Sequence, residues 1–312
     1  MRLVFLGTPQ FAVPTLESVV AAGHEVAAVL TQPDRPKGRG GKETASPVKE
    51  AALRLRLPVR QPERVRRPEV VGELAELRAD AMVIVGYGQI VPQSVIDLPR
   101  LGIVNVHASL LPAYRGAAPI QWAIARGESR TGVTTMRIDA GLDTGQMLLR
   151  WETAIGAEET AVELGPRLAI AGARLLLETL TGLEAGAIVP EPQASAKATY
   201  APILKKEDGH IDWRLSAAEI FNRARGFQPW PGCYTEMRGQ RLHIWRATPA
   251  GGWAAAPGLL RARGRALQVA CGDGTALELR EVQLEGRKRI SGEAFRNGYP
   301  MSENERLGER TT

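Results

Sequence analysis

The first half of the chain alternates short apolar runs with stretches whose apolar residues recur at helical spacing. Strands are expected at residues 3–6, 26–31, 81–86, 103–107, 133–137 and 147–151. Helices are expected at residues 12–22, 47–55, 68–77, 119–125 and 158–180. The run 81–85 is apolar throughout, as a strand covered on both faces should be. This alternation predicts an α/β domain built on a Rossmann-type, parallel-rich sheet.

The pattern changes in the last third of the chain. Past residue 210, short apolar runs are separated by Gly and Pro, at 241–247, 258–261, 267–270 and 276–282. Several short strands at such spacing predict a small β-barrel. A stretch with Gly, Pro and small polar residues separates the two patterns. We therefore expect a first domain at 1–185, a linker at 186–208 and a second domain at 209–312.

Charge is unevenly distributed between these parts. The formal net charge is +6; residues 209–312 hold 16 Lys and Arg against 11 Asp and Glu, whereas residues 1–208 hold 24 against 23. A basic second domain predicts an anionic partner such as RNA. A solvated, arginine-rich surface is the alternative.

Membrane and metal proteins are disfavoured by the composition. No apolar run approaches the roughly 18 to 20 residues that span a bilayer, and the first one is too short for a signal peptide. We therefore expect a cytoplasmic protein with no membrane partner. Separately, we expect it to be a monomer. Cys233 and Cys271 do not have the spacing of metal ligands, and the four histidines form no ligand pair. Neither a disulfide nor a metal site is expected.

A basic, glycine-rich segment follows the second expected strand. Residues 32–42 contain three glycines, two prolines and the four basic residues Arg35, Lys37, Arg39 and Lys42. This composition cannot form a core element, so we expect a mobile, exposed, basic loop. Loops of this kind often carry function, although a disordered connector is the alternative.

An amide, an imidazole and a carboxylate follow expected strands in the middle of the chain. Asn105 and His107 close the run 103–107, and Asp143 lies between glycines a short way on. The amide can donate to a developing oxyanion, while the imidazole and carboxylate can move a proton. Together they predict acyl transfer. Taken singly, Asn105 could hydrogen-bond to backbone groups at the end of a strand, and Asp143 could stabilise a turn between glycines.

The usual cofactors of such a sheet are not expected. The turn after the first strand reads Gly7-Thr-Pro-Gln-Phe11, without the G-x-G-x-x-G that pyrophosphate binding needs, and no Walker A motif is present. After the strand at 103–107, the residues Ser109, Leu110, Leu111 and Pro112 form an apolar turn with one hydroxyl. Such a turn suits a flat heteroaromatic ligand better than a phosphate.

Several motifs together resemble the folate-dependent formyltransferases. They are Asn105-x-His107-x-Ser109-Leu-Leu-Pro112, then Arg115-Gly116-Ala-Ala-Pro119-Ile, then Gly141-Leu-Asp143-Thr-Gly145. The resemblance begins at Phe5-x-Gly7-Thr-Pro9, includes Thr31-Gln-Pro-Asp34-Arg35-Pro36, and reaches Ile211-Asp-Trp213 and Pro229-Trp-Pro231 in the second domain. It therefore covers nearly the whole chain, with no departure at the three candidate catalytic positions.

This resemblance implies a reaction and a set of roles. Within the family, the chain is most similar to members that move the formyl group of 10-formyltetrahydrofolate to the methionine of initiator tRNA. It implies an OB-like second domain, catalysis by Asn105, His107 and Asp143, and no metal. The resemblance selects Asp143 over Asp139, because spacing alone cannot. Residues 109–112 would lie against folate, and Arg35, Lys37, Arg39 and Lys42 would approach the tRNA.

Two other functions remain compatible with these residues. A formyltransferase for sugar amines, or a formyl-folate hydrolase domain, would share Asn105, His107 and Asp143 but would not need the basic loop or the basic second domain. A non-catalytic RNA-binding protein with a degenerate enzyme fold would have lost one of the three residues. None is lost.

Overall fold

A computed structural model describes residues 1–37, 42–302 and 304–308. Of Lys37 and Lys42 it describes the backbone only. Its contacts divide the chain into two compact units. The first contains residues 1–119, 130–153 and 165–202, and the second contains residues 120–129, 154–164 and 203–312. The domain boundaries expected at 185 and 208 stay a prediction.

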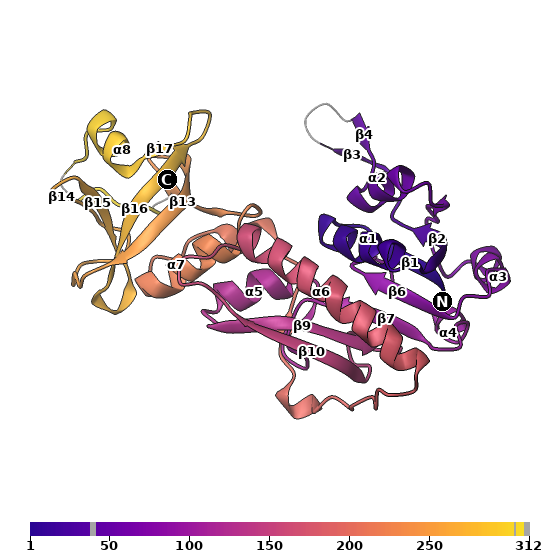
Figure 1. Ribbon diagram of the computed structural model, residues 1–312. Coiled ribbons are helices and arrows are strands. Elements are labelled where there is room, and N and C mark those ends of the chain that lie inside the picture. Colours follow the sequence, from indigo (N-terminus) through magenta and orange to yellow (C-terminus); the bar gives the residue numbers. More distant parts are fainter. Residues whose placement is uncertain (38–41, 303, 309–312) are drawn as a thin grey trace. The chain divides into compact units, whose positions relative to one another are not determined.

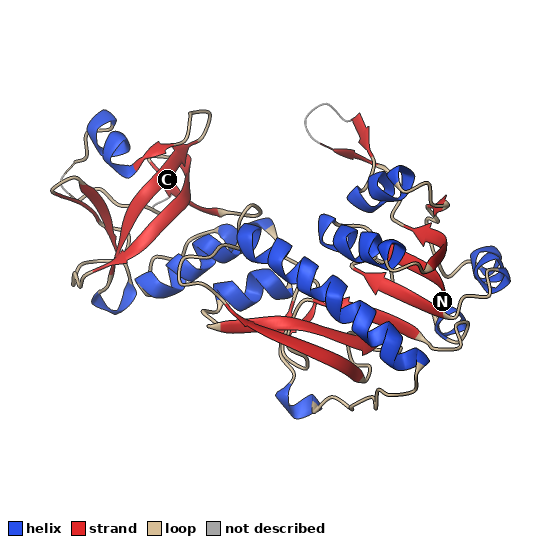
Figure 2. Ribbon diagram, in the orientation of Figure 1, coloured by secondary structure: helices blue, strands red, loops and turns tan. Residues whose placement is uncertain are grey.

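A seven-stranded sheet forms the centre of the first unit (Figures 1 and 2). Its order is β10-β9-β7-β6-β1-β2-β5. The strands are β1 (Arg2–Gly7), β2 (Glu25–Leu30), β5 (Val59–Arg60), β6 (Ala81–Val85), β7 (Ile103–His107), β9 (Arg130–Arg137) and β10 (Met147–Ala154). Strands β5, β2, β1, β6 and β7 are parallel, and β9 is antiparallel to β7. The predicted parallel-rich α/β sheet is confirmed.

Helices cover both faces of this sheet. They are α1 (Val13–Ala21), α2 (Pro47–Arg54), α3 (Pro68–Glu76), α4 (Gln93–Ile96) and α6 (Ala161–Glu184), whereas α5 (Pro119–Ala125) belongs from residue 120 onward to the second unit. On one face Val4, Leu6 and Met82 share a core cluster with Leu74 of α3 and Val95 of α4. On the other face α6 lies against β7. A Cβ on Gly172 of α6 would be 2.8 Å from Val106 Cγ1, so only glycine permits this approach.

The long helix begins later than predicted. It was expected at 158–180 and is found at Ala161–Glu184. Thr160 and Glu163 explain its start, because the backbone N–H and the hydroxyl of Thr160 both donate to Glu163 Oε2, each at 2.8 Å. The hydrogen bond from the Thr160 backbone N–H to the Glu163 carboxylate is one of the two that make up a capping box. It places the start of the helix after Thr160.

The basic segment contains strands where a loop was expected. β3 (Arg35–Lys37) pairs antiparallel with β4 (Lys42–Thr44) in a two-stranded sheet. Proline is tolerated in such a ribbon because each strand has a free edge. The prediction of a loop over the whole of 32–42 was therefore wrong at 35–37 and at 42, whereas 32–34 form no helix or strand and residues 38–41 lie outside the described part.

An antiparallel sheet forms the centre of the second unit. It contains β12 (Cys233–Met237), β13 (Gln240–Ala250), β16 (Ala276–Leu284), β15 (Ala266–Ala270) and β14 (Leu260–Arg263) in that order, with β17 (Ile290–Ser291) paired to β16. Besides α5, the described part of this unit contains the helices α7 (Ala217–Gly226) and α8 (Gly292–Gly298). Four of these strands were predicted, whereas β12, β17, α7 and α8 were not. Closure into a barrel stays a prediction.

Candidate active site

Asn105 and His107 lie on the same face of β7. Side chains alternate along a strand, so residues two apart share a face, and Val106 between them faces α6. The two side chains are nearly buried, with Asn105 at 7% and His107 at 6% exposure. His107 ends its strand at the carboxyl edge of the parallel strands, where ligands of such sheets bind.

Asp143 reaches these two residues from the loop between β9 and β10. Its Oδ2 lies 3.7 Å from His107 Nδ1, and its Oδ1 accepts a hydrogen bond of 3.4 Å from Asn105 Nδ2. The Gly116 amide donates to Oδ2 at 2.8 Å. The side chain of Asp143 is 14% exposed. The three residues that the sequence singled out therefore meet at one point.

Asp139, the other candidate carboxylate, has a different position. It is exposed, and its Oδ1 accepts hydrogen bonds from the Gly141 amide at 3.0 Å and the Thr144 hydroxyl at 2.7 Å. Asp139 thus shapes the loop that carries Asp143. Tertiary contacts distinguish the two carboxylates, which spacing along the chain cannot do.

A carbonyl group determines the protonation of one ring nitrogen of His107. Nε2 lies 2.9 Å from the carbonyl oxygen of Tyr114. Because a carbonyl only accepts, Nε2 must carry a hydrogen. Nδ1 then faces Asp143 as a lone pair in the neutral ring and as an N–H in the imidazolium. At 3.7 Å, Nδ1 and Asp143 Oδ2 are too far apart for a direct hydrogen bond.

The turn at 109–112 is held by its own hydrogen bonds. The Ser109 hydroxyl donates to Ala113 O at 2.6 Å, and Thr134 Oγ1 both donates to Ser109 O at 2.7 Å and accepts from Leu111 N at 3.1 Å. Ser109 and Leu111 are buried, and Leu111 joins a small apolar cluster. Leu110 and Pro112 are half-buried, so they present the ligand-accessible side chains of this turn.

The basic hairpin starts from the same edge of the sheet as His107. It follows β2, and Gln32 Nε2 donates to Tyr87 O at 3.1 Å in the loop after β6. Asp34 at the base of the hairpin forms an ion pair with Lys49, whose hydrogen bond lowers the pKa of that carboxyl. Arg35 is exposed. Arg39 and the side chains of Lys37 and Lys42 lie outside the described residues.

Some residues at this site were not predicted. Gln193 donates to the carbonyls of Asp143 and Gly145, and its own carbonyl accepts from Arg115. Tyr87 has a buried hydroxyl for which no partner is found among the described residues, and burial raises its pKa to about 12. The sequence carries no signal for Gln193, which is a single glutamine in an irregular segment.

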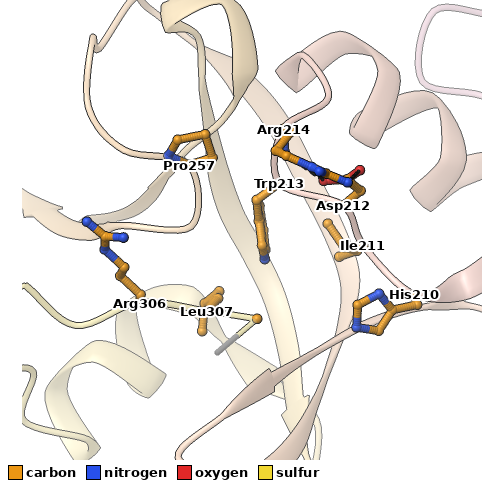
Figure 3. Close-up of a pocket in the computed structure, with 9 residues that line it drawn as sticks. His210, Ile211, Asp212, Trp213, Arg214, Pro257, Arg306 and Leu307 are labelled. Atoms are coloured by element: carbon orange, nitrogen blue, oxygen red, sulfur yellow. Dashed lines mark hydrogen bonds and ion pairs between the residues drawn. The ribbon is translucent and has the colours of Figure 1, made fainter. Parts of the chain in front are cut away.

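A cavity of about 400 Å³ lies within the second unit (Figure 3). Its lining comes from three short segments, namely residues 210–214, Pro257 and residues 306–308. Trp213 lies between Arg306 and the ion pair of Asp212 with Arg214, a pair that lowers the pKa of Asp212 to about 2. None of the site residues predicted from the sequence lines this cavity.

No group of three or more His, Cys, Asp or Glu among the described residues could hold a metal ion. No helix in this part of the chain is long and apolar enough to cross a membrane.

Comparisons with known proteins agree along the whole chain. Residues 1–180 match the model of the formyl transferase family, and residues 203–300 match that of the formyl transferase C-terminal domain. The methionyl-tRNA formyltransferase of Solibacter usitatus is 68% identical over 99% of both chains, and that of Koribacter versatilis is 58% identical over 99% of both. An N-formyltransferase from Helicobacter canadensis, solved with folinic acid and dTDP-3-aminofucose, has a TM-score of 0.65 at 17% identity and covers 89% of this chain and 98% of its own.

Proposed function

The chain belongs to the methionyl-tRNA formyltransferase family, and from this we propose how its residues move a formyl group from 10-formyltetrahydrofolate to the methionine of initiator tRNA. The observation that carries the mechanism is the meeting of Asn105, His107 and Asp143 at the end of β7. In the reaction, the neutral α-amino group of methionine attacks the formyl carbon. A C–N bond forms, the formyl oxygen becomes negative, and the bond from carbon to the folate nitrogen then breaks.

Asn105 and His107 stabilise the negative oxygen. Both are nearly buried, so their N–H groups act where water competes little. A donor of this kind contributes roughly 3 to 4 kcal/mol to transition-state stabilisation in known oxyanion holes. Asn105 offers its Nδ2 hydrogens, and His107 offers Nδ1–H when it is protonated.

Asp143 takes part in the proton transfers of the reaction. The attacking amine must lose one proton, and the folate nitrogen must gain one to leave. A carboxylate 3.7 Å from His107 Nδ1 can exchange a proton through a water molecule. Proton transfer of this kind is worth on the order of 100- to 10,000-fold in rate.

Folate occupies the edge of the sheet beside the turn formed by Ser109, Leu110, Leu111 and Pro112. Leu110 and Pro112 supply the partly exposed apolar surface for its ring system, while the buried Ser109 and Leu111 hold the turn in shape. The mechanism assigns no step to a metal ion.

The tRNA is held by two basic elements. The first is the β3–β4 hairpin with Arg35, Lys37, Arg39 and Lys42, which leaves the same sheet edge as the catalytic residues. The second is an OB-like domain at 209–312, which follows a linker at 186–208 and carries the excess of positive charge. We assign 1–185 as the catalytic domain, and the enzyme acts as a monomer in the cytoplasm, where charged tRNA is available.

An assay with three acceptors tests this function. Purified protein is given 10-formyltetrahydrofolate with methionyl initiator tRNA, with methionyl elongator tRNA, or with a nucleotide-linked amino sugar. We expect rapid formylation of the initiator tRNA alone. Formylation of the sugar without formylation of either tRNA would instead assign the chain to the sugar-amine branch of the family.

A further inference from the structure

Gln193 connects the segment between the two ranges that match the family models to the loop that carries Asp143. The matches to the family models end at residue 180 and resume at residue 203, so this segment belongs to neither. Gln193 is half-buried, whereas its neighbours Pro192 and Ala194 are exposed. Its Nε2 donates to Asp143 O at 2.8 Å and to Gly145 O at 2.7 Å. One side-chain amide therefore holds the loop at two points.

Arg115 determines which way this amide points. Its Nε and Nη2 donate to Gln193 Oε1 at 3.0 and 2.8 Å. A guanidinium only donates, so the amide oxygen must face Arg115 and the NH₂ group must face the loop. Arg115 is 3% exposed, and no carboxylate among the described residues lies within ion-pair distance of it. Its buried charge therefore depends on the Gln193 oxygen for stabilisation.

The loop needs such support because Asp143 has an unfavourable backbone. Its φ is +51°, a left-handed conformation that is uncommon for a residue other than glycine. Conformations of this kind persist only where surrounding contacts impose them. Gly145 adds a steric constraint, because a Cβ there would lie 1.8 Å from Arg137 O. The hydrogen bonds from Gln193 fall on the carbonyls of these two residues.

The contacts continue toward the end of the same segment. Thr199 Oγ1 accepts from Tyr114 N at 2.9 Å, and Thr199 O accepts from Arg115 N at 2.8 Å. Strand β11 (Tyr200–Ala201) then pairs in parallel with β8 (Arg115–Gly116). Tyr114 supplies the carbonyl that bonds His107 Nε2, and Gly116 supplies the amide that bonds Asp143. Residues 193–201 thus support the groups that orient both His107 and Asp143.

We propose that Gln193, oriented by Arg115, is a positioning residue that sets the carboxylate of Asp143 against His107. This inference rests on the catalytic role proposed above for Asp143. The segment between the two ranges that match the family models then supports catalysis as well as connecting them. Gln193 touches neither the formyl group nor the amine, and acts through Asp143.

Gln193→Ala tests the proposal, with Gln146→Ala as a matched control. Gln146 is an exposed glutamine that follows Gly145, and its only described hydrogen bond uses its backbone carbonyl. We expect Gln193→Ala to lower kcat about 10- to 100-fold while KM for tRNA and for the folate changes less than about 2-fold, since small displacements of catalytic groups have effects of this size. Gln146→Ala should match the parent. An unchanged kcat in Gln193→Ala overturns the proposal.

Gln193→Glu separates positioning from stability. A glutamate gains an ion pair with Arg115, but it presents an oxygen to the carbonyls of Asp143 and Gly145 and loses both hydrogen bonds. We expect a melting temperature equal to or above that of the parent together with a kcat at least 10-fold lower. A kcat that follows the melting temperature in both variants would indicate a merely structural role and would reject positioning.

Asp143→Asn distinguishes failure of this inference from failure of the proposed function. If Gln193 acts through Asp143, adding Gln193→Ala to Asp143→Asn lowers the single-turnover rate less than 2-fold further. Full additivity contradicts the proposal. Parent-like activity in Asp143→Asn itself would remove the premise, whereas an inactive Asp143→Asn with a fully active Gln193→Ala rejects only the role of Gln193.

Discussion

Asp143 Oδ2 lies 3.7 Å from Nδ1 of His107, and the second ring nitrogen of that histidine is already bonded to the Tyr114 carbonyl. The imidazole is therefore fixed in orientation on one side and faces a carboxylate on the other. This arrangement keeps Nδ1 of His107 beside the Asp143 carboxylate, where the proposed proton transfer takes place.

Replacing Asp143 by Asn should remove its charge while keeping its shape. An amide oxygen can still accept from Gly116 N, so the loop is retained. We expect kcat to fall by about 100- to 10,000-fold, with tRNA affinity little changed. Asp139→Asn is the matched control, because it keeps the acceptor used by Gly141 and Thr144 and should stay close to parent activity. Equal losses in the two variants would remove Asp143 from the proton path.

Asn105→Ala should remove an oxyanion donor. The loss of one such donor lowers kcat by about 100- to 1,000-fold. The dissociation constant of the folate should change little, because the donor acts on the charge that develops in the transition state. Single-turnover formylation and equilibrium folate binding, measured on the same preparation, decide the point. A loss confined to folate affinity would assign Asn105 to binding.

Arg35→Ala and Arg39→Ala should weaken the use of charged tRNA. Removing one phosphate contact reduces the slope of log affinity against log salt by about 1 and raises KM for tRNA. The folate dissociation constant should be unaffected. Arg66→Ala removes the same charge from another exposed position of the first unit and serves as the control. If all three variants lose affinity equally, net charge rather than the hairpin is responsible.

Glu305 should make the stability of the second unit depend on pH. Arg238 donates to it at 2.9 and 2.6 Å, and this contact holds the pKa of Glu305 at about 2 in the folded state. A pKa lower than in the unfolded chain contributes stability above the ordinary value of 4.5. This stability is lost as the pH falls from about 4.5 to about 2.

Glu305→Gln tests this dependence by thermal melting. We expect the variant to lose about 1.5 to 3 kcal/mol at pH 7. The difference from the parent should shrink as the pH falls below about 4.5 and vanish near pH 2. Glu293→Gln removes an exposed carboxylate 3.6 Å from Arg265 and should have little effect. A constant difference between Glu305→Gln and the parent at every pH would exclude the ion pair as its cause.

Two glycines of α6 should respond oppositely to alanine. A Cβ at Gly172 meets the buried Val106 at 2.8 Å, whereas a Cβ at Gly165 meets nothing within 4 Å. We expect Gly172→Ala to lose about 1 to 3 kcal/mol of unfolding free energy, because the core cannot expand freely. Gly165→Ala should gain about 0.5 to 1 kcal/mol through helix propensity. Unfolding in denaturant measures the free energy of unfolding of both variants. Stabilisation by Gly172→Ala would contradict the close packing of α6 against β7.

Several elements were predictable because their signals are local. The apolar run of β6 and the alternation in β7 require only neighbouring residues, and they already place Asn105 and His107 on one face. Helix α7 was missed although Ser216 and Glu219 form a capping box at its start, so a local signal was present. The hairpin of β3 and β4 could not be predicted, because its strands pair through backbone hydrogen bonds. A Gly- and Pro-rich composition gives no sign of such pairing.

By itself, the sequence determined the residue types of the reaction centre, the order of strands and helices in the first half, and the basic character of the last third. The family resemblance selected Asp143 over Asp139, but only the tertiary structure shows that the Asp143 carboxylate faces His107 and that Gln193, oriented by Arg115, holds its loop. The physical reason is the distance along the chain over which each kind of interaction acts. Periodicity and capping act between residues a few positions apart, whereas a carboxylate meets an imidazole through chain crossings that the packing of the whole sheet imposes.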